Sequence, residues 1–128
     1  MKHLSTVVLL LPLLAAPAMA QQFPKDFQGE WISEGDEPSV CKVGAFDRME
    51  SDAIMKVTTR DTQQIESGCQ LKAFKGQVSG ASVRLTCSGE GNTWQVNEIW
   101  SVRKVAGRTL LITANPKDNR IYVLAKCD

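Results

Sequence analysis

The residue types most able to do chemistry in this chain are its four cysteines, because its only histidine is His3. The cysteines are separated by 28, 18 and 40 positions and stand at Cys41, Cys69, Cys87 and Cys127. A zinc site built from thiolates alone needs closely spaced cysteines, as in a Cys-x-x-Cys pair. Widely spaced cysteines in an oxidising compartment are typical of disulfides. The spacing therefore predicts two crosslinks and no metal site.

The first twenty residues have the features of a secretory signal peptide. A positive start, an apolar run over 4–14 and the small-x-small site Ala18-Met19-Ala20 are its three usual parts. The apolar run is too short to span a bilayer, and Gln21 after the cleavage site is not the cysteine of a lipid anchor. We expect residues 1–20 to be removed, leaving a single domain over 21–128 in the periplasm and no membrane segment.

Removal of the signal peptide also removes His3, and the loss of the only histidine reduces the number of catalytic and metal-binding sites that the mature chain could form. Without histidine there is no Ser-His-Asp triad, no Cys-His pair and no His-ligated zinc. Two carboxylates beside a cleft could still hydrolyse a glycosidic bond, and the best placed are Glu66, Glu90 and Glu98. Calcium binding would need a regular acidic spacing, which is missing from Asp36, Glu37 and Asp47. We expect surface charges, no cofactor and no catalytic residue, so the protein is predicted not to be an enzyme.

The charge of the mature chain is balanced but unevenly distributed. Residues 25–66 contain ten acidic and five basic side chains, and residues 67–128 contain four acidic and nine basic ones. A net charge of zero argues against a nucleic-acid or anionic-membrane binder. The asymmetry fits either a surface of mixed sign or one basic face that meets an acidic partner.

Period-two alternation of apolar residues, punctuated by turn signals, predicts seven to eight short strands. With so little helix, the expected fold is all-β, a small antiparallel meander barrel. The expected strands are 27–32, 54–59, 63–66, 69–75, 81–87, 93–102, 109–113 and 120–125.

Four local features accompany these strands. Residues 21–25 are expected to be a flexible lead, and 45–52 to form a single helical turn. A change of apolar phase within 93–102 indicates a β-bulge. Gly29-x-Trp31 suggests a Trp that plugs one end of the barrel beside a close approach of backbone.

The disulfide pairing follows from one hairpin register. Cys69 and Cys87 are symmetric about Val78, and this register pairs apolar side chains on one face and polar ones on the other. The implied pairs are Leu71–Leu85, Ala73–Val83, Gln70–Thr86 and the like-charged Lys72–Arg84. Cys41–Cys127 then remains. The rival pairing of sequence neighbours, Cys41–Cys69 with Cys87–Cys127, stays open.

An eight-stranded barrel is nearly filled by its own side chains, so a packed core is favoured over a ligand cavity. The loops are then the working surface. A rigid, disulfide-stapled sheet that presents a firm loop suits a protein that blocks the cleft of an enzyme.

The mature chain resembles small periplasmic proteins of Gram-negative bacteria. The matching pattern is Gly29-x-Trp31, Cys41, Glu66-x-x-Cys69, Cys87-Ser88-Gly89-Glu90-Gly91-x-x-Trp94 and Cys127. This group is similar to periplasmic inhibitors of lysozyme and peptidoglycan hydrolases, which are small β-barrels with a Ser-Gly loop and a Tyr before a late Cys. The matches are Ser79-Gly80-Ala81 and Tyr122 before Lys126-Cys127, whereas the aromatic after Ser-Gly is absent and Val83 is nearest.

The resemblance implies a loop that hydrogen-bonds the catalytic carboxyls of a lysozyme-like enzyme. The residues that would do so are Lys75, Ser79, Gly80, Ala81 and Ser82. We expect a protein partner and a monomer or weak dimer. Two alternatives are a protease inhibitor acting through 21–25 and a lipocalin-like carrier of an apolar ligand. A projecting N-terminus would favour the first alternative, and a large internal pocket the second.

Overall fold

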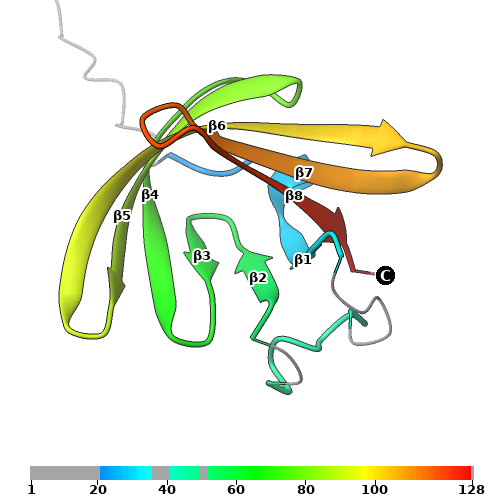
Figure 1. Cartoon of the computed structure of the whole chain (residues 1–128), viewed down its shortest axis with the longest axis horizontal. Coiled ribbons are helices and arrows are strands. Elements are labelled where there is room, and N and C mark those ends of the chain that lie inside the picture. The colour runs from blue at the N-terminus through cyan, green and yellow to red at the C-terminus, as the bar shows by residue number, and fades with distance from the viewer. Residues whose placement is uncertain (1–20, 36–40, 50–51, 128) are drawn as a thin grey trace, which may run out of the picture.

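The computed structural model describes residues 21–35, 41–49 and 52–127, so the expected signal peptide lies outside the described residues. Eight antiparallel strands form a closed barrel in which each strand pairs with the next and β8 pairs with β1 (Figure 1). The strands are β1 Gly29–Ser33, β2 Ile54–Val57, β3 Asp61–Gln63, β4 Ser67–Gln77, β5 Gly80–Gly89, β6 Asn92–Val105, β7 Arg108–Asn115 and β8 Arg120–Lys126. The predicted all-β meander barrel is confirmed.

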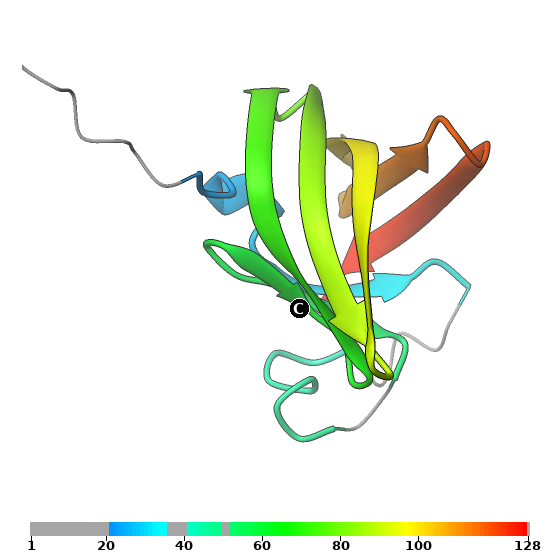
Figure 2. The ribbon, with the colours of Figure 1, turned by 90° about the vertical axis from the view of Figure 1, so that its left-hand side faces the viewer.

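Strand β6 organises the two halves of the barrel. Its first part pairs with β5, its second part pairs with β7, and both pairings include Ile99 and Trp100. The long strands β4, β5 and β6 make a curved wall (Figure 2). The opposite side is closed by short strands, and β2 and β3 share only the pairs Lys56–Gln63 and Val57–Thr62.

Both disulfides join the predicted partners. Cys69 and Cys87 are directly opposite each other on β4 and β5, with Cα atoms 3.9 Å apart. Cys41 and Cys127 have Cα atoms 4.8 Å apart and tie an early loop to the end of the chain. The rival pairing of sequence neighbours is therefore wrong.

The predicted β4–β5 register holds only as far as Leu71–Leu85. A bulge at Lys72 then shifts the register, so that Ala73 pairs with Arg84 and Phe74 with Val83. The predicted pairs Lys72–Arg84 and Ala73–Val83 are wrong, and the bulge removes the like-charge contact that the simple register required.

The bulge expected in β6 is also wrong, because its pairing with β5 and β7 is continuous. The apparent change of phase arises because Ile99 is an apolar side chain on the outer face, where it is half exposed. Trp94, Val96, Glu98 and Trp100 all occupy the inward-facing positions. In the sequence alone, an exposed Ile on the outer face gives the same apolar pattern as a register shift.

The N-terminal segment enters the barrel instead of forming a flexible lead. Phe23 is 2% exposed, and its backbone N donates to the carbonyl of Thr59. The Gln21 side chain accepts a hydrogen bond from the backbone N of Phe74. A turn of 3₁₀-helix, η1 (Lys25–Phe27), then buries Phe27. The expectation of flexibility fails because two aromatic side chains in this segment gain more from burial than the segment loses in entropy.

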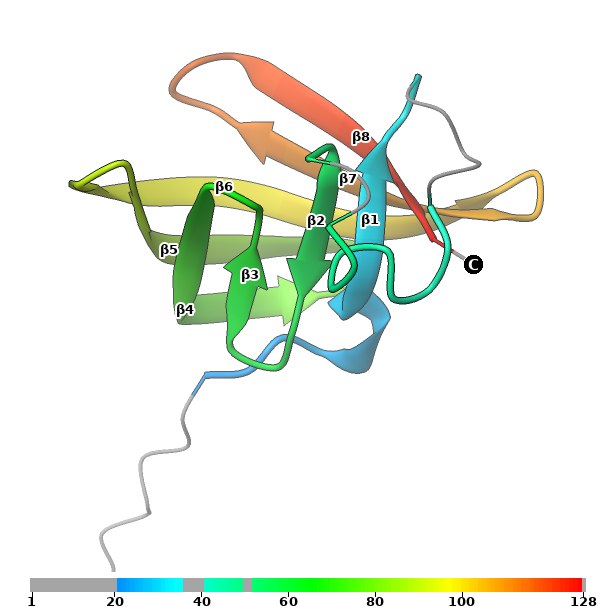
Figure 3. The ribbon, with the colours of Figure 1, turned by 90° about the horizontal axis from the view of Figure 1, so that it is seen from below.

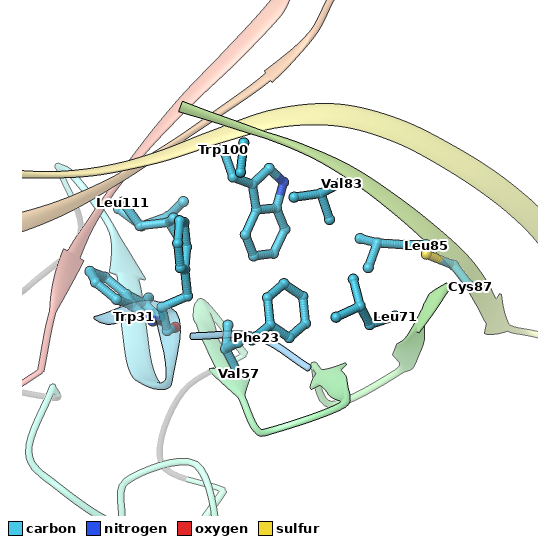
Figure 4. Close-up of a cluster of buried hydrophobic side chains, with 12 residues drawn as sticks. Phe23, Trp31, Val57, Leu71, Val83, Leu85, Cys87, Trp100 and Leu111 are labelled. Carbon is cyan, nitrogen blue, oxygen red and sulfur yellow. Dashed lines mark hydrogen bonds between the residues drawn. The ribbon is translucent and has the colours of Figure 1, made fainter. Parts of the chain in front are cut away.

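Aromatic rings fill the centre of the barrel (Figure 4). The Phe23 ring stacks on Trp100 at a centroid distance of 5.3 Å, and Phe74 meets Phe23 and Phe27 edge to face. Trp31 is fully buried, and its indole N donates to the carbonyl of Phe27. A buried Trp at this position is confirmed, and its role as a plug at one end of the barrel stays a prediction. The close approach at Gly29 comes from the side chain of Lys126 and not from backbone.

A smaller apolar cluster lies outside the barrel wall. Residues 41–49 pass against β1 and β2 (Figure 3), where Cys41 and Ala45 pack on Ile32 and Ile54. The segment consists of hydrogen-bonded turns and forms no helix in its described part. The single helical turn expected over 45–52 corresponds to one i→i−4 hydrogen bond, from Arg48 N to the carbonyl of Gly44. The Cys41–Cys127 disulfide links this segment covalently to the end of the chain after β8.

The packing of the N-terminal segment predicts a large effect of Phe23→Ala. Loss of a fully buried Phe typically costs about 3–5 kcal/mol, because burial is lost and a cavity remains. Urea denaturation should show this loss. The neighbouring exposed side chain offers a control, and Gln22→Ala should leave the midpoint nearly unchanged. Equal midpoints for Phe23→Ala and the parent would show that the segment does not belong to the core.

Candidate functional site

The β4–β5 hairpin presents a tight and well-anchored turn. Gln77 pairs with Gly80, so only Val78 and Ser79 form the turn itself. The carbonyl of Val78 accepts a hydrogen bond from the backbone N of Val102, which ties the turn to β6. Gly76 has φ +120°, and a Cβ there would lie 2.6 Å from the carbonyl oxygen of Gly80. Glycine is needed at this position for the two strands to approach so closely.

The five residues predicted for the inhibitory loop occupy three different environments. Ser79 and Gly80 are exposed at the turn. Lys75 and Ser82 face each other across the two strands and are exposed on the outer face of the barrel. Ala81 is 1% exposed and packs in the core, in register with Trp100. Placing Ala81 in a contact loop was therefore wrong, because strand alternation turns its methyl group inward.

Tyr122 does not join this hairpin. It is in register with Thr113, which is in register with the buried Trp100, so Tyr122 belongs to the inner face of β8. Its side chain is nevertheless 52% exposed. Strands β6 and β7 lie between β8 and β5. The Ser-Gly turn and the late Tyr are thus separate features of the surface.

The three candidate catalytic carboxylates are also spread out. Glu66 and Glu90 are exposed, one just before β4 and the other in the β5–β6 turn. Glu98 is an inward-facing residue of β6, in register with Val83. Among the calcium candidates, Asp47 forms an ion pair with Lys56, with 3.1 Å between Oδ1 and Nζ. Asp36 and Glu37 lie outside the described residues. In the described ranges, no group of three or more His, Cys, Asp or Glu residues could hold a metal ion.

Burial alters the acidity of the Glu98 carboxyl. Burial raises its pKa above the ordinary value of 4.5, and a hydrogen bond from the indole N of Trp100 at 3.3 Å offsets part of that increase. It is the only Asp or Glu on an inward-facing position of the described strands. A lone carboxyl can respond to pH but cannot supply the two roles that glycoside hydrolysis requires. Sequence analysis missed this orientation because it expected a bulge in β6.

Two pockets lie beside the barrel strands. One has a volume of about 460 Å³ and lies between the end of β1 and the start of β7, beside the ion pair of Glu34 with Arg108. The other has a volume of about 380 Å³ and lies over β3, β4 and β5 near Cys69 and Cys87. No helix in the part of the chain described here is long and apolar enough to cross a membrane.

No known protein family, curated protein or solved structure matches this chain.

The environment of Glu98 predicts a pH-dependent difference in stability. A carboxyl with a raised pKa in the folded state favours folding at low pH, and this contribution is lost as the pH rises through that pKa. Glu98→Gln keeps an acceptor for Trp100 and removes the buried charge. Its melting temperature should exceed that of the parent at pH 7 and approach it at pH 4. Thermal unfolding of both proteins, with Glu66→Gln as an exposed control, measures this. A constant difference across the range would contradict the assignment.

Proposed function

We propose that this protein is a periplasmic, non-enzymatic inhibitor of a peptidoglycan hydrolase of the lysozyme or muramidase type. The observation that carries the proposal is the β4–β5 hairpin, whose two-residue turn presents Ser79 to solvent and is anchored to β6 through Val78 and Val102. A loop that is already ordered loses little conformational entropy when it binds in a cleft.

The chemistry of this turn fits the cleft of such an enzyme. Muramidases act with carboxyl groups that flank the glycosidic bond. The Ser79 hydroxyl can donate a hydrogen bond to such a carboxylate, and Lys75, two residues before Gln77 on the same hairpin, adds positive charge. Hydrogen bonds to charged groups are roughly twice as strong as neutral ones. Occupation of the cleft by the turn would exclude the saccharide chain.

Two observations favour this proposal over the alternatives. The N-terminal segment packs Phe23 and Phe27 inside the barrel, so it lacks the projecting form that a protease inhibitor acting through 21–25 would need. The same rings occupy the space that a lipocalin-like carrier would keep for its ligand. The two disulfides support an oxidising compartment such as the periplasm.

The proposal predicts that the oxidised protein slows a muramidase acting on peptidoglycan. Inhibition should weaken with added salt, because the Debye length falls to roughly 8 Å at physiological ionic strength and shortens further above it. Ser79→Ala combined with Lys75→Ala should raise the inhibition constant about tenfold or more, since a hydrogen bond to a charged group is worth roughly 1.5–3 kcal/mol. Its melting temperature should stay near that of the parent, because both side chains are exposed.

A matched control removes the same two residue types from other hairpins. Ser88 and Lys117 are exposed near the β5–β6 and β7–β8 turns, and Ser88→Ala with Lys117→Ala should inhibit like the parent. The protein alone should release no soluble fragments from peptidoglycan. If no muramidase is inhibited, the proposed function is wrong. If the Ser79 and Lys75 variant inhibits fully, the hairpin is not the inhibitory element.

A further inference from the structure

The outer face of β6, β7 and β8 carries an apolar patch that the barrel core does not use. Ile99 on β6 pairs with Ala114 on β7, which pairs with Ile121 on β8, and the next row contains Ile112 and Val123. These five residues are called the Ile99 patch. Ile99 is 50% exposed and Ile121 is 68% exposed. Single exposed aliphatic residues are ordinary, but these five form a contiguous group on strands β6, β7 and β8, which are neighbours in the sheet (Figure 1). Such a group is typical of an interaction surface.

The Ile99 patch is continuous with the proposed inhibitory hairpin. Ser82 on β5 is in register with both Lys75 on β4 and Ile99 on β6. One cross-strand row therefore runs from the Lys75 side chain through Ser82 and Ile99 to Ile121, all on the outside of the barrel. A partner whose cleft binds the hairpin would also contact the first residues of this row, Lys75 and Ser82.

Basic side chains predominate around the Ile99 patch, although Glu34 lies beside it, because its backbone N donates to the carbonyl of Val123. The outward-facing positions of β4 to β8 carry no Asp or Glu, and their basic residues are Lys72, Lys75, Arg84, Arg103 and Arg108. Arg108 is paired with Glu34. Lys75, Arg84 and Arg103 are exposed and form no ion pair with any described residue, although Arg84 donates a hydrogen bond to Asn97. The patch is thus an apolar centre with an unneutralised basic rim.

We propose that the Ile99 patch docks on an acidic protein surface with an apolar centre, namely the surface beside the catalytic cleft of the inhibited hydrolase. This inference rests on the proposed function and adds a second area of contact to the hairpin. Apolar side chains at the centre supply the burial, and a ring of opposite charge supplies specificity and a faster encounter.

The same charges disfavour a second copy of this chain as the occupant. In a two-fold dimer the same surface is used by both subunits. The Lys75, Arg84 and Arg103 side chains of both copies would then gather around one interface, and the only adjoining carboxylate among the described residues that is paired with a base there, Glu34, is already bound to Arg108. Like charges brought together in this way oppose association.

The test compares binding of the oxidised protein and two variants to the muramidase that it inhibits. Ile99→Ser with Ile121→Ser should raise the dissociation constant at least tenfold, because two aliphatic side chains lose their burial in the complex. Arg84→Glu with Arg103→Glu should slow association and abolish its acceleration at low salt. Val43 and Met49 are 74% and 68% exposed outside the patch, so Val43→Ser with Met49→Ser is the matched control and should bind like the parent.

Four results would overturn the proposal. If the parent inhibits and the Ile99 and Ile121 variant binds equally well, the patch is not the docking surface and the proposed function stands. If the parent inhibits no muramidase, both inferences fall together. Sedimentation as a dimer that the same variant disrupts would make a second copy the occupant. Binding of the parent to phosphatidylglycerol vesicles, lost in the variant, would assign the surface to a lipid.

Discussion

The filling of the barrel interior is the constraint on which the rest of the structure depends. Eight strands enclose a space that side chains can just occupy. Here Phe23 and Phe27 arrive from outside the strands and complete the packing around Trp31 and Trp100. A barrel filled in this way has little volume left for a ligand. Its outer face and its turns are therefore the surfaces through which it can act.

The bulge at Lys72 links this interior to the outer surface. Before the bulge Cys69 and Leu71 face inward, and after it Phe74 faces inward. One inserted residue thus allows Phe74 to pack against the N-terminal rings and at the same time directs Lys75 outward beside Ser82. The bulge therefore determines both the packing of Phe74 in the core and the outward direction of Lys75, because side chains alternate strictly on each side of it.

Much of the fold could be predicted because it depends on local patterns. Strand alternation and Gly-containing turns identify seven of the eight strands, whereas the strand expected at 63–66 meets β3 (Asp61–Gln63) only at Gln63. The symmetry of Cys69 and Cys87 about Val78 identifies the hairpin and hence both disulfides. The bulge leaves no such signal, because Ala73 and Phe74 are both apolar and either can face inward. Ile99 misleads the prediction in another way. It is apolar but lies on the outer face, and a pattern of apolar residues alone assigns such a residue to the core.

The candidate site was less predictable than the fold. Ser79 and Lys75 are exposed as expected, but the inward direction of Ala81 depends on its register with Trp100. The row from Lys75 to Ile121 joins residues that are up to 46 positions apart in sequence. Such a surface exists only once the order and register of five strands are known. No property of the individual segments indicates it.

The claim that the protein acts through the outside of β4 to β8 is tested most directly by amide hydrogen exchange. Exchange would be measured on the oxidised protein alone and in complex with an inhibited muramidase. Protection should increase in the β4–β5 turn around Ser79 and in the outer strands around Ile99 and Ile121, and should stay unchanged in the β5–β6 turn around Glu90. Protection confined to that turn or to the segment around Glu34 would contradict the claim.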